Sequence, residues 1–320
     1  VDLFAGTGDG KVLFYNNLSS TALDLEAAEE MTYGSTVIDV GAHAKPFAVD
    51  WDNDNCTDLL VGNSAGEVLL FEGAGDCNGT FGQGAVLVST GNTMGGHAAP
   101  YVTDWNGDYA KDLVVGGADG RMMLYENACS DGSPCFDGGN VMQTAKGADI
   151  DAGDFAAPLI VDMDRNGRLD MAFGRDDGTI SGCLYATTAE SAFGNLKAET
   201  FETGLYCSDG PWQSVYMDVF QVMDAGEASA PAMADVNGDS QLDLFAGSAS
   251  GEIYYYPSSH MDGDLDRSAK VDGGDWILLM QSMGLCEGEE GYNPGADLNG
   301  DGCVDSSDEA VLNNNFGYTY

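Results

Sequence analysis

Basic residues are scarce in this chain. Its 320 residues include 11 Lys and Arg against 53 Asp and Glu, which gives a formal net charge of −42 at pH 7. A field of this sign repels nucleic acids and anionic membrane surfaces, because both carry dense negative charge themselves. We therefore expect neither nucleic acid nor an anionic membrane as a partner.

Long hydrophobic runs are also missing. No stretch approaches the roughly eighteen consecutive apolar residues that a membrane-spanning helix needs, and no segment has the layout of a signal peptide. We therefore expect no membrane insertion. The chain begins at Val1, inside a repeat rather than at a methionine, which is expected of a processed or incomplete chain.

Paired cysteines of the zinc-binding kind are absent. None of the eight cysteines lies in a CxxC pair, so a set of disulfides formed in an oxidising compartment is the better interpretation. Proximity in sequence suggests the pairs Cys56–Cys77, Cys129–Cys135, Cys183–Cys207 and Cys286–Cys303. Glycosylation sequons at Asn17, Asn55 and Asn78 are compatible with secretion. These features predict a secreted, extracellular or cell-surface protein.

Proline is rare and glycine abundant, with eight against 45 residues. Glycine at this level, without a triplet period, is typical of many tight turns between many short strands. Stretches with helical periodicity occur only near the C-terminal end. The chain is therefore predicted to be mainly β, with a small α domain at its end.

One unit recurs along residues 1–257. It consists of a short apolar strand, an acid-rich loop, a second strand, a glycine-bounded turn and a third strand. Four full copies occupy residues 46–73, 100–127, 158–185 and 231–257, and residues 1–17 match the second half of the unit. The acid-rich loops start at Asp50, Asp104, Asp162 and Asp235, at spacings of 54, 58 and 73 residues. Such spacings are typical of β-propeller blades.

The strand count leaves the propeller incomplete. Fourth strands are expected near residues 35–40, 85–90 and 141–145, but the first unit lacks its inner strand and its acid-rich loop, and the last lacks an outer strand. We predict a propeller of about five four-stranded blades. Three explanations for the missing strands stay open: a ring of imperfect blades, residues upstream of Val1, or a strand from a neighbouring molecule.

The acid-rich loops have the spacing of calcium loops. Acids or amides stand at positions one, three, five and nine, and the residue at position seven offers its carbonyl oxygen. Four copies in one register favour metal binding over a metal-free turn, because clustered carboxylates repel one another unless a cation lies between them. The predicted ligands are Asp50, Asp52, Asp54, Cys56 and Asp58; Asp104, Asn106, Asp108, Ala110 and Asp112; Asp162, Asp164, Asn166, Arg168 and Asp170; and Asp235, Asn237, Asp239, Gln241 and Asp243.

Residues 258–320 form a separate domain in which a loop followed by a helix occurs twice. The helices are expected around 276–283 and 310–316, and each loop has an acid at position twelve. The predicted calcium ligands are Asp264, Asp266, Ser268, Lys270, Asp272 and Asp275 in the first loop, and Asp297, Asn299, Asp301, Cys303, Asp305 and Asp308 in the second. The whole chain is thus expected to bind about six Ca²⁺ ions in a structural role.

These patterns resemble two known families. The acid loops, each followed by an apolar strand and a G-x-x-x-G turn, resemble the FG-GAP (VCBS-type) repeats of integrin α-subunit propellers. The tail, with DLNGDGCVDSSD, is similar to a dockerin, a paired EF-hand-like module. The Ser306-Ser307 pair matches the residues that dockerins use to bind cohesins, whereas Gly273-Gly274 in the first loop does not. The resemblance implies a protein or glycan partner at the propeller loops, and self-assembly or a cohesin-like partner at the tail.

Catalytic signatures are weak. Gly62-Asn63-Ser64-Ala65-Gly66 satisfies G-x-S-x-G, but that motif needs a helix after it, and residues 67–73 are predicted to form a strand. His43 and His97 occupy equivalent places before a first strand, which favours a structural role. We therefore expect no enzyme, and instead a non-catalytic extracellular adhesion or assembly module. A carbohydrate-binding lectin and a dockerin-bearing component of a polysaccharide-active enzyme are the alternatives.

Overall fold

The structure is a computed structural model, and it describes part of the chain. The described residues are 2–19, 22–73, 77, 79–91, 93–136, 138–161, 168–175, 178–186, 204–207, 229–236, 243–256, 265, 271, 273–286, 289, 291–293, 296–298 and 302–316. Outside them lie Asn78 and thirteen of the predicted metal ligands: Asp162, Asp164, Asn166, Asn237, Asp239, Gln241, Asp264, Asp266, Ser268, Lys270, Asp272, Asn299 and Asp301.

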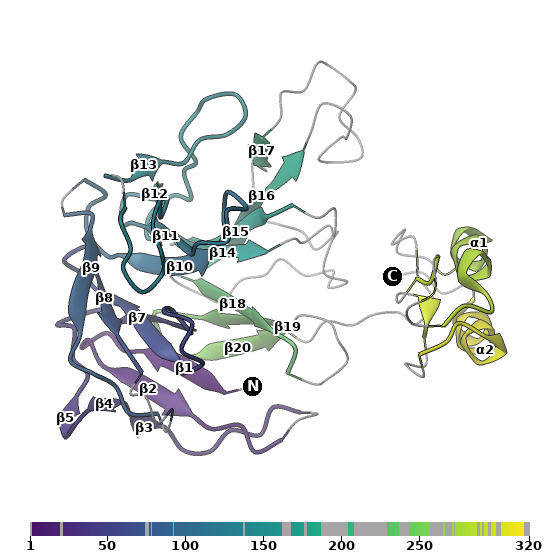
Figure 1. Cartoon of the computed structure of the whole chain (residues 1–320), viewed down its shortest axis with the longest axis horizontal. Coiled ribbons are helices and arrows are strands. Elements are labelled where there is room, and N and C mark those ends of the chain that lie inside the picture. The colour runs from purple at the N-terminus through teal and green to yellow at the C-terminus, as the bar shows by residue number, and fades with distance from the viewer. Residues whose placement is uncertain are drawn as a thin grey trace. The chain divides into compact units, whose positions relative to one another are not determined.

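The described residues up to Tyr256 form one compact unit, and those from Leu265 onward form a second. The first unit consists of antiparallel sheets with neighbouring strands consecutive in sequence (Figure 1). Its first sheets contain β1 (Leu3–Gly6), β2 (Val12–Tyr15) and β3 (Glu29–Glu30); β4 (Thr32–Tyr33) and β5 (Thr36–Val37); and β6 (Lys45–Val49), β7 (Asp58–Gly62), β8 (Glu67–Phe71) and β9 (Ala85–Ser89).

The remaining sheets contain β10 (Ala99–Thr103), β11 (Asp112–Gly116), β12 (Met122–Tyr125) and β13 (Asn140–Val141); β14 (Ala157–Val161), β15 (Asp170–Gly174), β16 (Ile180–Ala186) and β17 (Gly204–Cys207); and β18 (Ala230–Ala234), β19 (Asp243–Gly247) and β20 (Ile253–Tyr256). The prediction of a mainly β chain is confirmed. The five sheets that begin with β1, β6, β10, β14 and β18 are called the repeat sheets below, because each corresponds to one sequence repeat.

The repeat sheets hold three, four, four, four and three strands, as the repeats predict. The outermost strand of the first repeat sheet, which was expected near residues 35–40, lies elsewhere. It is β3, at Glu29–Glu30, and residues 32–37 form the separate hairpin β4–β5 instead. The expected strand at 141–145 is also reduced to the two residues of β13.

Neighbouring repeat sheets pack through their first strands, so β1, β6, β10, β14 and β18 follow one another in space. Apolar clusters fill the layers between them. The residue pattern of the second strands explains this, because Leu59 and Val61 of β7 pack toward the first repeat sheet while Leu60 packs toward the third. Strands buried on both faces read as continuous apolar runs, as DLLVG and DLVVG do here. A closed propeller is not detected among the described residues.

A glycine ends each of the strands β1, β7, β11, β15 and β19, and at the first four of these positions the packing of the next sheet requires it. A Cβ atom placed on Gly62 would lie 2.0 Å from the Ala98 carbonyl oxygen, directly before β10. A Cβ atom placed on Gly6, Gly116 or Gly174 would likewise lie 1.8, 2.2 or 2.1 Å from the carbonyl oxygen of the residue before the next sheet. The backbone before each new sheet thus lies so close to the glycine of the preceding sheet that no side chain would fit between them. A Cβ atom placed on Gly247, in the last repeat sheet, would approach one atom of the described residues within 4 Å, the Ala230 carbonyl oxygen at 3.9 Å.

The second unit contains two helices, α1 (Gly273–Ser282) and α2 (Ser306–Asn315). Both start earlier than the apolar stretches predict, because the turn of acidic and small residues before each stretch is already helical. Their buried side chains, Leu279 and Leu312, pack with Val271, Ala296 and Val304. No helix in the described part of the chain is long and apolar enough to span a membrane.

The contrast between the glycines is a test of the sheet-to-sheet contact. We expect Gly62→Ala to destabilise the protein strongly, by about 2 kcal/mol or more, because the obstacle is backbone that must shift. Gly247→Ala serves as the matched control and is expected to change stability by less than about 0.5 kcal/mol. Urea denaturation followed by tryptophan fluorescence measures both. Equal losses for the two variants would contradict the assignment.

Candidate metal centre

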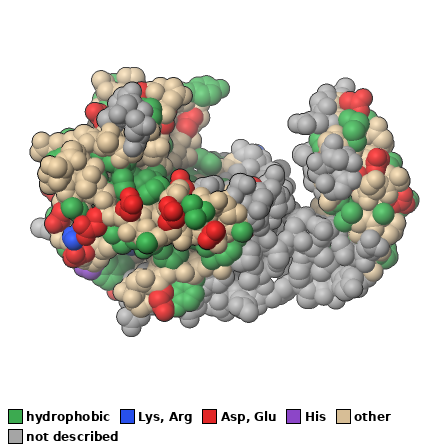
Figure 2. Space-filling model, turned by 90° about the horizontal axis from the view of Figure 1, so that it is seen from below, with side chains coloured by type: hydrophobic (Ala, Val, Ile, Leu, Met, Phe, Trp, Pro, Cys, Tyr) green, Lys and Arg blue, Asp and Glu red, His purple; other side chains and the backbone are tan. Residues whose placement is uncertain are grey.

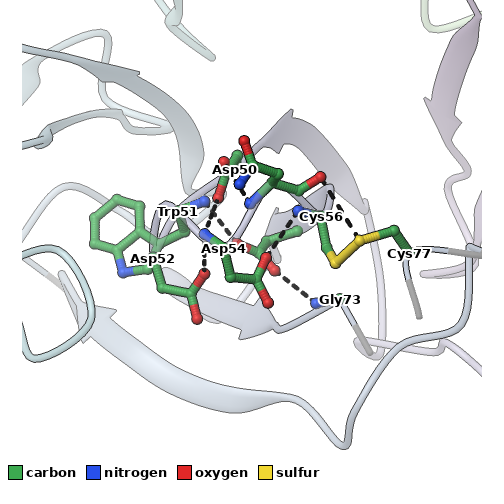
Figure 3. The surroundings of a disulfide bond; sticks show 9 residues. Asp50, Trp51, Asp52, Asp54, Cys56, Gly73 and Cys77 are labelled. Atoms are coloured by element: carbon green, nitrogen blue, oxygen red, sulfur yellow. Dashed lines mark hydrogen bonds between the residues drawn. A yellow bond between two sulfur atoms is a disulfide. The ribbon is translucent and has the colours of Figure 1, made fainter. Parts of the chain in front are cut away.

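The first acid loop brings three carboxylates together. One oxygen each of Asp50, Asp52 and Asp58 can be chosen so that all lie within 4.8 Å of one another. Figure 3 shows Asp50 and Asp52 of this group. Calcium takes oxygen ligands at about 2.3–2.6 Å, so two ligands on opposite sides of the ion stand about 5 Å apart. The spacing of these oxygens therefore fits a cation of this size.

Backbone N–H groups hold the loop in this shape. The Asp54 N–H donates to Asp50 Oδ1 at 3.0 Å, the Asn55 N–H to Asp50 Oδ2 at 3.0 Å, and the Cys56 N–H to Asp54 Oδ1 at 2.7 Å. Asn53 and Asn55 have positive φ values of 64° and 68°, which asparagine tolerates better than most residues. The Asx-rich sequence thus turns the chain tightly and points its carboxylates inward.

A disulfide fixes position seven of the first loop. Cys56 is bonded to Cys77, which lies beyond β8, and Cys56 is buried (Figure 3). Cys129–Cys135 and Cys286–Cys303 are the other two bonds whose geometry the structure describes, so these three predicted pairs are confirmed. The strand register places Cys183 directly opposite Cys207, as the fourth predicted pair requires. Bonds of this kind form in an oxidising compartment.

The second loop repeats the hydrogen bonds of the first. Asp104 accepts from the N–H groups of Asp108 at 3.1 Å and Tyr109 at 3.0 Å, and Asp108 Oδ1 accepts from the Ala110 N–H at 2.9 Å. Asn106 Oδ1 accepts from the Asp108 N–H at 2.9 Å. In both loops the predicted ligands therefore surround the same turn.

The acid at position nine has a second role that the sequence did not predict. Its side chain is buried in four repeat sheets, at Asp58, Asp112, Asp170 and Asp243. Asp112 accepts from the Trp105 N–H at 2.9 Å and from the Asn127 N–H at 2.8 Å, so one carboxylate joins the acid loop to the end of the third strand. Asp58 does the same with Trp51 at 2.6 Å and Gly73 at 2.5 Å.

The equivalent acids of the other repeat sheets also accept backbone N–H groups, and this arrangement is called the carboxylate clasp below. Asp170 accepts from the Tyr185 N–H at 2.7 Å, and Asp243 accepts from the Val236 N–H at 3.1 Å. Asp2 accepts from the Asn17 N–H at 2.9 Å, across the same fifteen-residue separation as Asp58 and Gly73. Asp2 is thus the ninth-position acid of the incomplete first repeat. The match of residues 2–6 (DLFAG) to 243–247 (DLFAG) is the sequence signal that identifies it.

Burial raises the pKa of Asp58 and of Asp112 above its usual value, and the charges of nearby loop acids add to the effect. The backbone N–H donors oppose this shift without cancelling it. The ionised form of each carboxylate therefore carries a cost, which a bound cation would offset.

A charged network joins the first two loops. Asn53 Nδ2 donates to Asp131 Oδ2 at 2.8 Å, while Lys111 Nζ donates to the same oxygen at 3.0 Å and to Asn53 Oδ1 at 2.6 Å. Although burial opposes it, the pKa of Asp131 is held below its usual value by the Lys111 backbone N–H, which donates to Asp131 Oδ1 at 2.7 Å, and by the Asn53 and Lys111 side chains. No sequence signal pointed to Asp131, because it belongs to the loop closed by Cys129–Cys135 and not to an acid loop.

The remaining predicted ligands are described only in part. Arg168 and Asp170 of the third loop and Asp235 and Asp243 of the fourth lie within the described residues. In the second tail loop, Asp297 Oδ2 accepts from the Gly302 N–H at 2.8 Å and from the Tyr292 hydroxyl at 2.9 Å. Asp308 is buried and accepts from the N–H groups of Leu298 and Asp305, each at 2.7 Å, completing a capping box at the start of α2. Asp275 is buried on α1.

Other sequence candidates have structural positions. Ser64 lies in the turn between β7 and β8, so a strand follows it and the nucleophile elbow lacks its helix. His43 and His97 lie side by side, with ring centroids 4.7 Å apart, and His97 also contacts Phe155 at 4.9 Å. All three residues occupy the equivalent turn, with φ between 52° and 58°. Asn17 uses its side chain in its own loop, where Oδ1 accepts from the Asp24 N–H.

Comparison with known proteins supports the repeat assignment. Residues 50–115, which span the first two acid loops, match the FG-GAP-like repeat family. No curated protein matches the sequence significantly.

Among solved structures, BBS1N in complex with ARL6DN is 14% identical, over 81% of this chain and 75% of that one, at a TM-score of 0.34. The Tc holotoxin pore of Photorhabdus luminescens is 12% identical, over 80% of this chain and 14% of that one, at a TM-score of 0.32. Structural similarity at this level does not establish a common fold or function with this chain.

Removing one clasp carboxylate tests its role. We expect Asp112→Ala to destabilise the protein by about 2–4 kcal/mol in the presence of chelator, because one buried and one partly buried backbone N–H group lose their acceptor. Asp108→Ala, in the exposed part of the same loop, is the control and should cost less than about 1 kcal/mol. Chemical denaturation gives both values. A loss in the control as large as in Asp112→Ala would rule out a special role for position nine.

Proposed function

We propose that this chain is a calcium-binding β-propeller that acts as a non-catalytic adhesion or assembly module outside the cell. The convergence of Asp50, Asp52 and Asp58 at the end of a strand pair is the observation that carries the calcium assignment. No acid of the first two loops forms an ion pair with Lys or Arg among the described residues. A bound cation would relieve the repulsion between these carboxylates.

The donor chemistry favours calcium over a transition metal. The first loop offers four aspartates and the carbonyl of Cys56, and the second offers Asp104, Asn106, Asp108, Asp112 and the carbonyl of Ala110. Such all-oxygen sets suit a hard cation. When bound, the ion would contribute structural cross-linking, since Asp58 and Asp112 belong to the second strand and the other ligands to the loop before it.

The same chemistry extends to the other four predicted sites. The third and fourth loops would each add one ion, and the two tail loops would add two more, for about six in all. In the tail, Asp297 and Asp305 lie before α2 and Asp308 lies in its first turn, which is the order that an EF-hand-like or dockerin-like loop requires. Such a tail would bind a cohesin-like partner or mediate self-assembly.

The order of the repeat sheets supports the ring. Each sheet packs against the next through its first strand, and the cores lie between sheets, as in propeller blades. All acid loops join a first strand to a second, so they share one end of the sheets. A disc of this kind presents a rigid face of loops to a partner.

The loop face has a feature suited to binding protein or glycan. Tyr109, at the tip of the second acid loop, is 93% exposed. The whole chain holds 53 Asp and Glu against 11 Lys and Arg, and acidic side chains also outnumber basic ones on the described surface that Figure 2 shows. The preferred partner surface is therefore basic or neutral. Stacking of sugars on exposed tyrosines would serve a lectin, the alternative function, whereas Trp51 is buried in the core and is not available for it.

Calcium binding is tested by its effect on stability. A site filled at a hundred times its Kd adds about 2.7 kcal/mol, so several sites should raise the melting temperature by about 5 °C or more. Asp52→Ala should lose part of this gain, whereas the exposed control Asp154→Ala should keep all of it. Differential scanning fluorimetry with calcium and with chelator gives the result. An unchanged melting temperature with chelator would contradict the calcium assignment.

The assembly role is tested on the same protein. We expect light scattering to find particles larger than one chain in calcium, and their dissociation by chelator. A single chain under both conditions would contradict assembly. Binding on a glycan array in calcium, lost in Tyr109→Ala, would then favour the lectin.

A further inference from the structure

Residues 127–136 contain the second described disulfide, and they are called the disulfide loop below. They belong to the second full repeat but lie against the acid loop of the first. Asn53 Nδ2 donates to Asp131 Oδ2 at 2.8 Å, across 78 residues of sequence. A Cβ atom placed on Gly132 would lie 3.8 Å from the Cβ atom of Asp52. The disulfide loop thus supports the first acid loop beside one of its predicted ligands.

The same segment also holds the second acid loop. Asp131 Oδ1 accepts from the N–H of Lys111, at position eight of that loop, at 2.7 Å. The Asn127 N–H donates to Asp112 Oδ1 at 2.8 Å, and Asn127 Oδ1 accepts from the N–H groups of both cysteines of the disulfide at 3.1 Å. The disulfide loop therefore bonds to position nine of the second acid loop as well as to position eight.

Lys111 joins the two acid loops directly. Its Nζ donates to Asn53 Oδ1 at 2.6 Å and to Asp131 Oδ2 at 3.0 Å. The Asp131 side chain is 6% exposed and the Lys111 side chain 21%. Solvent and salt screen such a pair less than a pair on the open surface. A displacement of Asn53 would therefore be felt at Lys111 and Asp131 together.

We propose that Asn53 and Asp131 couple the first two predicted metal sites, so that a cation bound in one acid loop raises the affinity of the other. Both are positioning residues, because they would act through the ligands next to them and are not predicted ligands themselves. This inference rests on the calcium binding proposed above, and it adds that the two sites fill cooperatively.

The places of these residues in the two loops explain how the effect would pass between the sites. Asn53 lies between the ligands at positions three and five of the first loop, so a cation there would hold its side chain in one place. Lys111 lies between the ligands at positions seven and nine of the second loop. The first ion thus orders groups that the second ion would otherwise have to order, which gives positive cooperativity. The coupling acts equally in both directions.

Hydrogen exchange during a calcium titration of the full chain measures the two sites separately. The amides of residues 50–58 report the first loop and those of residues 104–112 the second. Asp52→Ala removes a ligand of the first loop but keeps the Cβ atom that faces Gly132. We expect it to raise the calcium midpoint of the second loop by about fivefold or more. Asp108→Ala should raise the midpoint of the first loop by a similar factor.

Removing the link between the loops should abolish this effect. Asn53→Gly deletes the side chain, and glycine adopts the positive φ of 64° without strain. In this background Asp52→Ala should shift the second midpoint by less than about twofold, as for independent sites. Asp131→Asn keeps the shape of the side chain but removes the charge that holds Lys111, and it should reduce the shift in the same way.

Asn55→Gly is the matched control. Asn55 lies in the same turn, with a φ of 68°, and among the described residues its side chain makes no hydrogen bond to the disulfide loop. The fivefold shift should persist in this background. All variants are produced in a host that attaches no N-glycans, because Asn55 begins a sequon.

The outcomes separate the coupling from the calcium assignment. Protection of both acid loops by calcium, with an Asp52→Ala shift below twofold, overturns the coupling alone. An equal reduction of the shift by Asn53→Gly and Asn55→Gly also overturns it, because the turn and not the Asn53–Asp131 bond would then be responsible. Protection of neither loop contradicts the calcium assignment and overturns the coupling with it.

Discussion

The fold depends on a buried carboxylate that recurs at the start of each second strand. In the second and third repeat sheets this Asp receives one N–H from the acid loop and one from the end of the third strand. A buried charge is costly unless donors surround it, and here the backbone provides them. The carboxylate thus fixes where the loop begins, where the second strand begins and where the third ends. The geometry of the candidate metal site follows from that arrangement.

The sheet-to-sheet contact is the second constraint, and it acts at the opposite end of the same strand. At Gly6, Gly62, Gly116 and Gly174 the absence of a side chain lets the next repeat approach within a distance that excludes a Cβ atom. Between these two points, the alternating side chains of the second strand fill the cores on both sides. A five-residue stretch such as DLLVG therefore has three roles. Its Asp binds the loop through backbone N–H groups, its apolar residues fill the cores on both faces of the sheet, and its Gly allows the close approach of the next sheet. The first repeat sheet keeps this stretch as DLFAG, in which Asp2 accepts from the Asn17 N–H and Gly6 lies against the Ala44 carbonyl group.

The two acid loops of the family match have different supports. A disulfide holds the first at position seven, and the second has none there but is joined to the first through Asn53, Lys111 and Asp131. These supports come from residues far apart in the sequence. They explain how exposed acidic loops keep one shape while their own charges repel.

The sequence alone determined the mainly β class, the order and strand content of the repeat sheets, and three disulfide pairs. It could do so because strand alternation, glycine-bounded turns and short cysteine spacings are local signals. The positions of the acid loops at strand ends were predictable for the same reason. Tertiary structure decided what those local signals do not carry. It made the ninth-position Asp a buried clasp, added Asp2 and Asp131 to the loops, placed His43 beside His97, and converted residues 32–37 into a hairpin of their own. The Asn53–Asp131 bond and the His43–His97 contact join different repeats, while the carboxylate bonds join the two ends of one repeat, and in each case the partner lies outside the short stretch that carries the local signal.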